Sequence, residues 1–330
     1  QIINYITSEE SVHQTTSRQH IEKEQTFMNL MEANALSTRF TFEDLLEIAM
    51  RTKCFVVARF ILEKLRRYDK MIECYVLSND SHQLFRYIMD YKNVDERKIY
   101  QQILEHFQAL LVLDCDKISQ LIIEFYPICI PQFLATVANN SKLNFEFLNK
   151  LITNGSVDLE ICEYDKFIAL LLQYKPENVL EFLQNPSHNY KVDYALMLCE
   201  EKSLTCAIIY LHEKKGDYKK AIALSMELLK ETPESQAESQ ALRLCSLCSR
   251  ISNIVGDSEA FWFELIEMVL SRSYLSHIVK QVLHLSSSFV DLTKLVQLIM
   301  RSDGEANSFG DIKHILIDML TNFEYESLML

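Results

Sequence analysis

Apolar residues recur at the spacing of an amphipathic helix along most of the chain. Positions i, i+3, i+4 and i+7 are apolar in three clear sets: Phe42, Leu45, Leu46 and Ala49; Ala58, Ile61, Leu62 and Leu65; and Ile118, Leu121, Ile122 and Phe125. Such spacing gathers these side chains on one face of a helix. No segment shows a convincing strand alternation, and the pattern predicts about eighteen helices of roughly 10–16 residues.

Polar residues and prolines mark where several of these helices begin and end. Thr41, followed by Asp44, predicts a capping box at the start of the first set. Pro127 predicts the end of the third set, because proline cannot continue a helix. Ser308 and Asp311 predict one more start near the end of the chain.

Two stretches, "ILEKLRRYDKMI" (61–72) and "LHEKKGDYKKAI" (211–222), align at an offset of 150 residues. They share the following residues: Glu63/Glu213, Lys64/Lys214, Tyr68/Tyr218, Lys70/Lys220 and Ile72/Ile222. They could be a binding motif used twice or one structural unit repeated. In both, a helix ends in the Glu-Lys turn and another begins near the tyrosine, whose ring we expect to cover the apolar seam. We expect the cationic side chains of both stretches to be solvated helix ends.

Helix pairs of this kind cannot bury their apolar faces alone, but stacked neighbours bury them mutually. The offset corresponds to about four pairs at the roughly 34–47 residues typical of helical repeats. We therefore predict an all-α fold, an elongated α-solenoid of stacked antiparallel helix pairs. Residues 1–26 are expected to be a polar, flexible lead-in, and residues 27–330 a continuous solenoid. Within it, 41–230 form the repeats and 231–330 a C-terminal helical extension.

Composition narrows the function classes. Five glycines and five prolines in 330 residues are few for a chain with many tight turns, which favours helices. The net charge of −13 lacks the cationic surface that nucleic acids and anionic membranes require. We therefore expect no nucleic-acid partner.

Nine cysteines are scattered singly, as expected for reduced thiols in the cytoplasm. No apolar run reaches the roughly 18–20 residues that cross a bilayer, so no transmembrane segment is expected. The polar start lacks the apolar core of a signal peptide. The chain opens at Gln1 and stops inside the apolar run "SLML", so we expect it to be a piece of a longer protein.

Candidate chemistry is sparse. Cys245 and Cys248 form one C-x-x-C, whereas zinc needs about four ligands. The nearest other candidates, Cys199, Cys206 and His212, lack ligand spacing. Two residues at i and i+3 share a helix face, so we expect the pair to pack in the core.

Asp114 and Asp116 flank Cys115 and are expected to cap the helix that follows, where carboxylates meet the positive helix end. Trp262 is expected to be buried packing. No H-x-x-x-H and no phosphate-binding or nucleophile-elbow motif is present. We therefore predict no catalytic, cofactor-binding or metal-binding residues, no cofactor and no enzyme activity.

Three segments resemble the clathrin heavy-chain repeat, the α-solenoid that clathrin shares with the large vacuolar-sorting tether subunits. They cover about residues 41–230 and read "FEDLLEIAMRTKCFVVARFILEKLRRYDKMIECYVLSNDSHQLFRYI", "LLVLDCDKISQLIIEFYPICIPQFL" and "YKVDYALMLCEEKSLTCAIIYLHEKKGDYKKAIALSMELL". Near the end, "FWFELIEMVL" and "FGDIKHILIDMLTNFEYESLML" resemble the C-terminal part of the family of CORVET-specific tether subunits.

This resemblance implies a scaffold of a multisubunit endosomal tether that supports vesicle tethering and fusion in transport to the vacuole or lysosome. It implies other class C vacuolar-sorting subunits as partners and, at the level of the complex, an early-endosomal Rab-family GTPase. It also implies a cytoplasmic protein peripherally associated with early endosomes. The β-propeller and RING module of that family have no counterpart in these residues, so their activities are not carried over.

Three alternatives remain open. The first is a vesicle-coat scaffold or another HOPS-type tether subunit. The second, of another class, is the helical arm of a ubiquitin ligase. The third is a TPR adaptor for short peptides, although its W-x-x-L-G consensus and regular 34-residue period are not visible.

Overall fold

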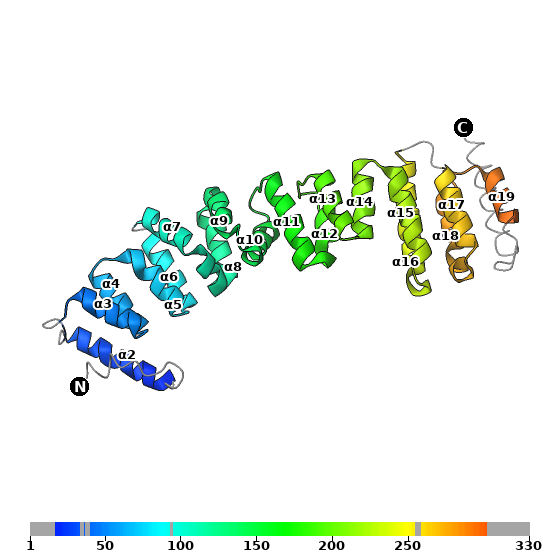
Figure 1. The fold of residues 1–330 in the computed structure, drawn as a ribbon. Coiled ribbons are helices and arrows are strands. Elements are labelled where there is room, and N and C mark those ends of the chain that lie inside the picture. Colours follow the sequence, from blue (N-terminus) through cyan, green and yellow to red (C-terminus); the bar gives the residue numbers. More distant parts are fainter. Residues whose placement is uncertain (1–16, 34–35, 37–39, 93–94, 255–258, 302–330) are drawn as a thin grey trace. The chain divides into compact units, whose positions relative to one another are not determined.

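The computed structural model describes residues 17–301, apart from 34–35, 37–39, 93–94 and 255–258 (Figure 1). All regular secondary structure in these residues is helical, which confirms the predicted all-α class. The start predicted at Ser308 and Asp311 lies outside the described residues. The chain divides into two compact units, 1–159 and 160–330, called here the N-terminal unit and the C-terminal unit.

The α-helices described in the N-terminal unit are α2 (Ser17–Glu32), α3 (Phe42–Arg51), α4 (Phe55–Lys64), α5 (Met71–Leu77), α6 (Ser81–Lys92), α7 (Glu96–Glu105), α8 (Phe107–Phe125), α9 (Ile130–Val137) and α10 (Ser141–Asn154). Short 3-10 turns η1 (Tyr68–Lys70) and η2 (Pro127–Cys129) precede α5 and α9. α2 begins inside the segment expected to be a polar lead-in. The flexibility of that segment stays a prediction.

The α-helices described in the C-terminal unit are α11 (Ile161–Tyr174), α12 (Val179–Gln184), α13 (Val192–Glu201), α14 (Thr205–Lys215), α15 (Tyr218–Glu231), α16 (Glu234–Ser252), α17 (Glu259–Leu270), α18 (Val279–Ser286) and α19 (Leu292–Arg301). The 3-10 turns here are η3 (Pro176–Asn178) and η4 (Ser273–Ile278). The eighteen α-helices described in the two units range from 6 to 19 residues, a wider spread than the sequence predicts.

Within each unit, helices pack mainly on their neighbours along the chain. In the N-terminal unit α3 contacts α4, α4 contacts α5, and α5 contacts α6 (Figure 1). In the C-terminal unit α13, α14, α15 and α16 contact one another in the same consecutive way. This neighbour-to-neighbour stacking is the packing of an α-solenoid. One continuous array across both units stays a prediction.

The 150-residue offset extends well beyond the two corner stretches. α13 begins and ends 150 residues after α3, and α14 begins 150 residues after α4. Buried side chains also fall at equivalent positions: Leu45/Ala195, Leu46/Leu196, Ala49/Cys199, Val57/Ala207, Ile61/Leu211, Leu62/His212, Met71/Ala221 and Ile72/Ile222. We call α3–α4–α5 and α13–α14–α15 the two copies of the repeat.

The turns between the helices of the repeat share one hydrogen-bond pattern. After α4, the N–H of Arg66 donates to the carbonyl of Glu63 (3.1 Å), and the next N–H donates to the carbonyl of Leu62 (2.9 Å). After α14, the N–H of Gly216 donates to the carbonyl of Glu213 (3.1 Å). The N–H of Asp217 donates to the carbonyl of His212 (2.9 Å). Both are Schellman turns, in which Arg66 and Gly216 have φ of 56° and 90°.

The turn after α3 and the turn after α13 repeat the pattern at the same offset. Lys53 and Ser203 have φ of 59° and 55°, and each donates to the carbonyl three residues back. Four turns of one type at matched positions identify the shared sequence as a structural unit. This settles the alternative between a ligand motif and a repeat in favour of the repeat.

The corner tyrosines lie where the sequence predicts, between one helix and the next. Tyr68 opens η1 and packs against Tyr91, with ring centroids 4.9 Å apart. Tyr218 is the first residue of α15 and packs, half-buried, on the hydrophobic core of the C-terminal unit. The copies differ here, because the first copy inserts a 3-10 turn before its third helix and the second does not.

The predicted capping residues have three different outcomes. The Thr41 hydroxyl accepts from the Asp44 N–H (3.2 Å), and Asp44 accepts from the Thr41 N–H (3.0 Å), so the capping box is confirmed. α8 is interrupted at Asp114, whose carboxylate accepts from the Lys117 N–H (3.1 Å) and caps the second half of the helix. Asp116 instead pairs with Lys150, on α10.

Candidate functional site

A groove of about 600 Å³ lies over α4, α5 and α6 in the N-terminal unit, and we call it the α4–α6 groove. Its lining residues come from four helices: Met28, Val56, Arg59, Phe60, Glu63, Met71, Tyr75, His82, Gln83, Arg86, Tyr87, Asp90 and Tyr91. Aromatic and charged side chains dominate this surface, which is typical of protein-binding surfaces more than of small-molecule sites.

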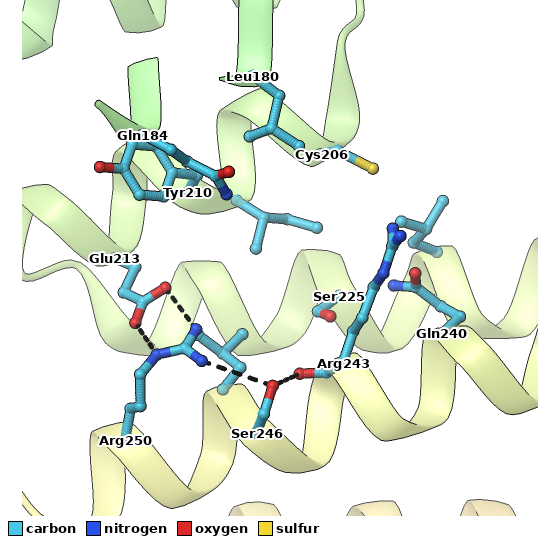
Figure 2. Close-up of a pocket in the computed structure, with 13 residues that line it drawn as sticks. Leu180, Gln184, Cys206, Tyr210, Glu213, Ser225, Gln240, Arg243, Ser246 and Arg250 are labelled. Atoms are coloured by element: carbon cyan, nitrogen blue, oxygen red, sulfur yellow. Dashed lines mark hydrogen bonds and ion pairs between the residues drawn. The ribbon is translucent and has the colours of Figure 1, made fainter. Parts of the chain in front are cut away.

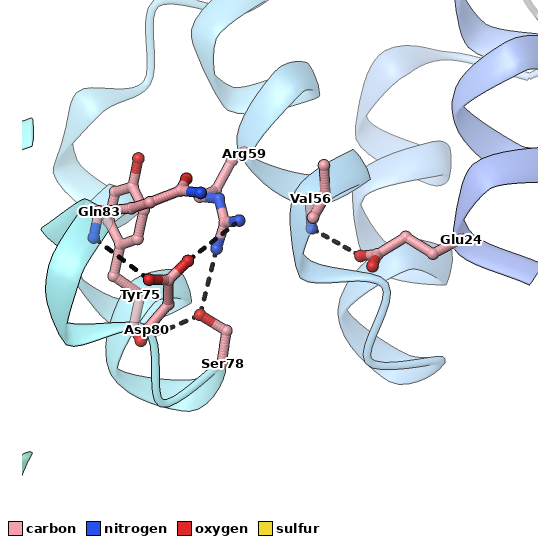
Figure 3. A network of polar contacts seen from close by, with 7 residues as sticks. All are labelled: Glu24, Val56, Arg59, Tyr75, Ser78, Asp80 and Gln83. Carbon is pink, nitrogen blue, oxygen red and sulfur yellow. Dashed lines mark hydrogen bonds and ion pairs between the residues drawn. The ribbon is translucent and has the colours of Figure 1, made fainter. Parts of the chain in front are cut away.

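Arg59 occupies the centre of a polar network in this groove (Figure 3). Its guanidinium donates to the Ser78 hydroxyl (3.1 Å), lies 3.9 Å from the Asp80 carboxylate and stacks 4.6 Å above the Tyr75 ring. Only 9% of Arg59 is exposed. Burial raises the pKa of the Tyr75 hydroxyl. Since the cation is paired, hydrogen-bonded and stacked, it serves packing and leaves little charge free for a ligand.

The start of α4 receives its cap from another helix. The Glu24 carboxylate, on α2, accepts from the Val56 N–H (2.7 Å), as Figure 3 shows. The residue before α4, Cys54, makes no side-chain cap. The first turn of a helix carries unpaired N–H groups and partial positive charge, so a carboxylate there is stabilising. This contact ties α2 to the repeat.

A row of tyrosines borders the same groove. Ring centroids are 4.9 Å apart for Tyr68 and Tyr91, 4.6 Å for Tyr91 and Tyr87, and 5.4 Å for Tyr87 and Tyr75. Desolvation, followed by the Tyr68 hydroxyl, raises the pKa of Tyr91 to about 12. Tyr91 therefore stays neutral at physiological pH, and the row presents aromatic area at low entropic cost.

A second groove, of about 330 Å³, lies in the C-terminal unit, and we call it the α16 groove (Figure 2). Its lining residues come from α12, α14, α15 and α16: Leu180, Gln184, Cys206, Ile209, Tyr210, Glu213, Ser225, Leu228, Gln240, Arg243, Ser246, Leu247 and Arg250. Six of them stand 150 residues after lining residues of the α4–α6 groove. The two grooves therefore use the same face of the repeat.

One end of the α16 groove is electrically neutral. Arg250 donates to both carboxylate oxygens of Glu213, from Nε (2.7 Å) and from Nη2 (3.0 Å). Its Nη1 lies 3.5 Å from the Ser246 hydroxyl (Figure 2). This paired geometry joins α14 to α16 and cancels the charge of both residues.

The other end of the α16 groove keeps an unpaired cation. Arg243 is exposed and makes no ion pair with any described residue. Beside it lie Gln240, 9% exposed, and Ser225, 3% exposed (Figure 2). Neither side chain hydrogen-bonds to another residue in the described part of the chain. The polar atoms of Gln240 and Ser225 are therefore available to a ligand or to water in the groove.

The lysines of the second corner depart in part from the prediction of solvated helix ends. Lys214 donates to the Tyr190 hydroxyl (2.9 Å) and lies 4.1 Å from the centroid of that ring. Burial lowers the pKa of Lys214. Lys215 pairs with Asp193, on α13, at 2.7 Å. The sequence could not show these contacts, because both partners lie a helix or more away.

The C-x-x-C cysteines pack in the core, as the sequence predicts. Cys245 and Cys248 are buried, and burial raises the pKa of each thiol to about 12. Cys199 and His212 are buried on α13 and α14, and Cys206 is exposed at the α16 groove. Among the described residues, no three His, Cys, Asp or Glu side chains are grouped so that they could hold a metal.

Trp262 is fully buried, as predicted. Its indole N–H donates to the Ser252 hydroxyl (2.9 Å), and its ring stacks on Phe289 with centroids 5.9 Å apart. Both contacts are made inside the C-terminal unit.

The membrane-spanning criterion of length and apolar character is not met by any single helix in the described ranges. Within those ranges it is met only by α8 taken together with residues 127–137, and this pair is bent by 110°.

Known proteins resemble nearly the whole chain. It is 29% identical over 329 residues to the vacuolar protein sorting-associated protein 8 homolog of Drosophila melanogaster, covering 99% of this chain and 27% of that protein. It is 24% identical over 357 residues to the Homo sapiens homolog of the same name, with coverage of 94% and 25%. The chain thus spans about a quarter of the length of these relatives.

A more distant relative carries a different name. The chain is 19% identical over 179 residues to the vacuolar protein sorting-associated protein 41 homolog of Solanum lycopersicum, covering 51% of this chain and 18% of that protein. The family model described as the Vps41 TPR-like region matches residues 25–270, which include both copies of the repeat and both grooves. The chain therefore belongs to the Vps41 TPR-like region family.

Proposed function

We propose that this chain is a helical scaffold segment of a multisubunit, CORVET-like membrane tether. The tether supports vesicle tethering and fusion in endosome-to-vacuole or endosome-to-lysosome transport. The observation that carries the proposal is the similarity, along 99% and 94% of the chain, to two vacuolar protein sorting-associated protein 8 homologs. The role is cytoplasmic, with peripheral association at early endosomes.

The packing of each unit suits a scaffold. Helices that contact mainly their chain neighbours leave long side surfaces free for partners. Both grooves are open, polar-rimmed and lined from several helices, and a few buried anchors in such grooves supply most of the binding energy of an interface. The proposed role requires no catalysis and no cofactor.

The partners proposed are the other class C vacuolar-sorting tether subunits. An early-endosomal Rab-family GTPase is a partner at the level of the complex. A stack of helices presents surface at every repeat, which suits direct binding of the tether subunits. Direct binding of the GTPase to this chain is not part of the proposal.

Reconstitution tests this proposal. The chain is mixed with purified class C tether subunits and analysed by size-exclusion chromatography with light scattering. We expect a complex with at least one subunit at micromolar concentration. Ala223→Glu, at an exposed position of α15, serves as the folded control and should still assemble. Elution of the wild-type chain alone, at every concentration and with every subunit, would refute the scaffold role.

A second candidate is a subunit of a HOPS-type tether, favoured by the match to the protein 41 homolog. Competition separates the two candidates. Excess full-length protein 8 homolog should displace the chain from class C subunits if the first proposal holds. Displacement by the protein 41 homolog alone would favour the second.

A further inference from the structure

We propose that the α16 groove binds a short extended peptide segment of a partner protein, in which an acidic side chain is followed by an aliphatic one. The inference deepens the scaffold role and rests on it for the source of the peptide. The recognition chemistry comes from the groove itself, through one charge, two polar side chains and an apolar wall.

The charge is that of Arg243. The chain carries a net charge of −13, and the other arginine of the groove, Arg250, is neutralised by Glu213. A carboxylate is therefore attracted to the Arg243 end and gains little at the Arg250 end. A planar guanidinium matches a carboxylate in a paired, two-hydrogen-bond geometry.

The polar side chains are Gln240 and Ser225. Both are more than nine-tenths buried, both line the groove, and neither is hydrogen-bonded to a described residue. A glutamine amide offers a donor and an acceptor together, which is what the N–H and carbonyl of an extended peptide require. A peptide backbone in the groove can hydrogen-bond to both side chains at once.

The apolar wall is formed by Ile209, Leu180 and Leu228, each half-buried at the groove. An aliphatic side chain placed on them removes apolar surface from water on both partners. A volume of about 330 Å³ is at the low end for ligand sites, which limits the occupant to two or three residues.

The first copy of the repeat carries different side chains at the equivalent positions. Arg59 occupies the position of Ile209, and Tyr75 occupies that of Ser225, and these two side chains stack on each other. The second copy replaces this pair by smaller side chains and places a cation from α16 beside the opening. The N-terminal unit thus has an arginine paired within its own chain at the position where the C-terminal unit has an aliphatic side chain.

The occupant is a peptide because one exposed arginine flanked by a buried amide makes a poor lipid site. Binding to an anionic membrane surface takes clusters of lysine and arginine. The pairing of donor and acceptor in Gln240 also has no counterpart in the oxygens of a phosphate, which only accept.

Methyl NMR of the complete chain, labelled at isoleucine and leucine methyl groups, tests the inference. The probe is acetyl-Ala-Glu-Leu-Ala-amide, and its counterparts carry Gln or Lys in place of Glu. We expect chemical-shift changes at Ile209, Leu180 and Leu228 with the Glu peptide. Binding should be about tenfold weaker or more for the Gln peptide and lost for the Lys peptide.

Variants locate the interaction. Arg243→Gln should weaken binding of the Glu peptide at least about tenfold. Ile209→Arg, which copies the first repeat, should abolish it. Arg97→Gln removes the same charge from an exposed position of α7 and should leave binding unchanged. Unchanged thermal unfolding of Arg243→Gln shows that any loss of binding is local.

Three results would overturn the inference. They are an absence of shifts at the groove methyl groups, equal binding of the Glu and Lys peptides, and displacement of the Glu peptide by equimolar inorganic phosphate. The peptide experiment uses no tether subunit, so its failure leaves the assembly experiment untouched. Assembly of the Arg243→Gln chain with class C subunits would in turn support the scaffold role independently of the groove.

Discussion

The α4–α6 groove and the α16 groove occupy the same face of the two copies of one repeat, yet their chemistry differs. Six lining positions correspond at the 150-residue offset: Val56/Cys206, Arg59/Ile209, Phe60/Tyr210, Glu63/Glu213, Tyr75/Ser225 and Asp90/Gln240. In the first copy the Arg59 guanidinium stacks on the Tyr75 ring. In the second copy the glutamate pairs with an arginine of α16, and two buried polar side chains have no hydrogen-bond partner among the described residues.

The difference shows which parts of a helical repeat are constrained. The bounds of the first helix, the start of the second helix and the Schellman turns coincide, because they depend on backbone geometry and on a few buried apolar positions. The groove-lining side chains have diverged, because an exposed or half-buried position can change without moving the helices. A repeat can therefore keep its frame and offer a different binding surface in each copy.

The largest expected effect comes from the helix seam of the second copy. Ala221 is fully buried on α15, where the first copy has Met71. Ala221→Glu should destabilise the C-terminal unit by about 3–5 kcal/mol, because an unpaired charge enters the seam. The fluorescence of Trp262, the single tryptophan, reports urea unfolding of that unit.

Ala223→Glu is the matched control, two residues along the same helix at an exposed position. It should change the unfolding free energy by less than about 0.5 kcal/mol. Similar urea midpoints for the wild type and Ala221→Glu would mean that the seam lies elsewhere on α15.

The next largest effect is expected at Leu62 and His212, which occupy equivalent buried positions in the two copies. His212 is 5% exposed, and its Nδ1 lies 3.5 Å from the Asp217 carboxylate. In the first copy Arg67 stands at the position of Asp217, so Leu62→His would bury an imidazole without an acidic partner at that position. We expect a loss of about 2–4 kcal/mol, measured by far-UV circular dichroism in urea.

The reverse exchange sharpens this test. His212→Leu removes a polar group whose Nδ1 lacks a hydrogen bond in good geometry. It should stabilise the C-terminal unit by about 1 kcal/mol. Destabilisation by His212→Leu would instead show that the contact with Asp217 contributes to folding.

The groove positions should give a smaller effect. Arg59→Ile puts the residue of the second copy into the first, and removes both the stacking on Tyr75 and the hydrogen bond to Ser78. We expect a loss of about 1–2 kcal/mol. A double-mutant cycle with Tyr75→Ser should show positive coupling. Arg86→Gln, at an exposed position of α6, is the control, and additive effects in the cycle would contradict the stacking contribution.

The smallest effect is expected at the turn between the helices of each corner. Gly216 has φ of 90°, and a Cβ there would meet no atom within 4 Å, so Gly216→Ala costs only backbone strain, about 1 kcal/mol. Arg66 already adopts a positive φ, and Arg66→Gly should stabilise the N-terminal unit by less than about 1 kcal/mol. Changes of the same sign in urea unfolding for both variants would show that the two turns are not equivalent.

Much of the fold was predictable because it rests on local signals. The helical spacing, the capping box at Thr41 and the corner positions of Tyr68 and Tyr218 all depend on residues within a few positions of one another. The packing of Trp262 and the burial of Cys245 also followed from their apolar surroundings in the sequence.

The grooves were not predictable in the same way. Arg243, Gln240 and Ser225 meet only because α15 and α16 pack together, and nothing local marks them. One signal was available, since extending the 150-residue alignment on both sides of the corner brings Val56 onto Cys206 and Arg59 onto Ile209. That alignment identifies a shared face but not its depth or charge balance.

The helices, the capping box at Thr41 and the repeated corner follow from local sequence signals, because helix periodicity and turn hydrogen bonds act over a few residues. Which charged and polar side chains find a partner depends instead on how the helices pack together. Arg59 is paired and stacked, Arg250 is neutralised by a residue of another helix, and Arg243 is left free of any described acidic partner. The physical reason is that pairing and burial depend on distances between helices, which residue spacing along one helix does not specify.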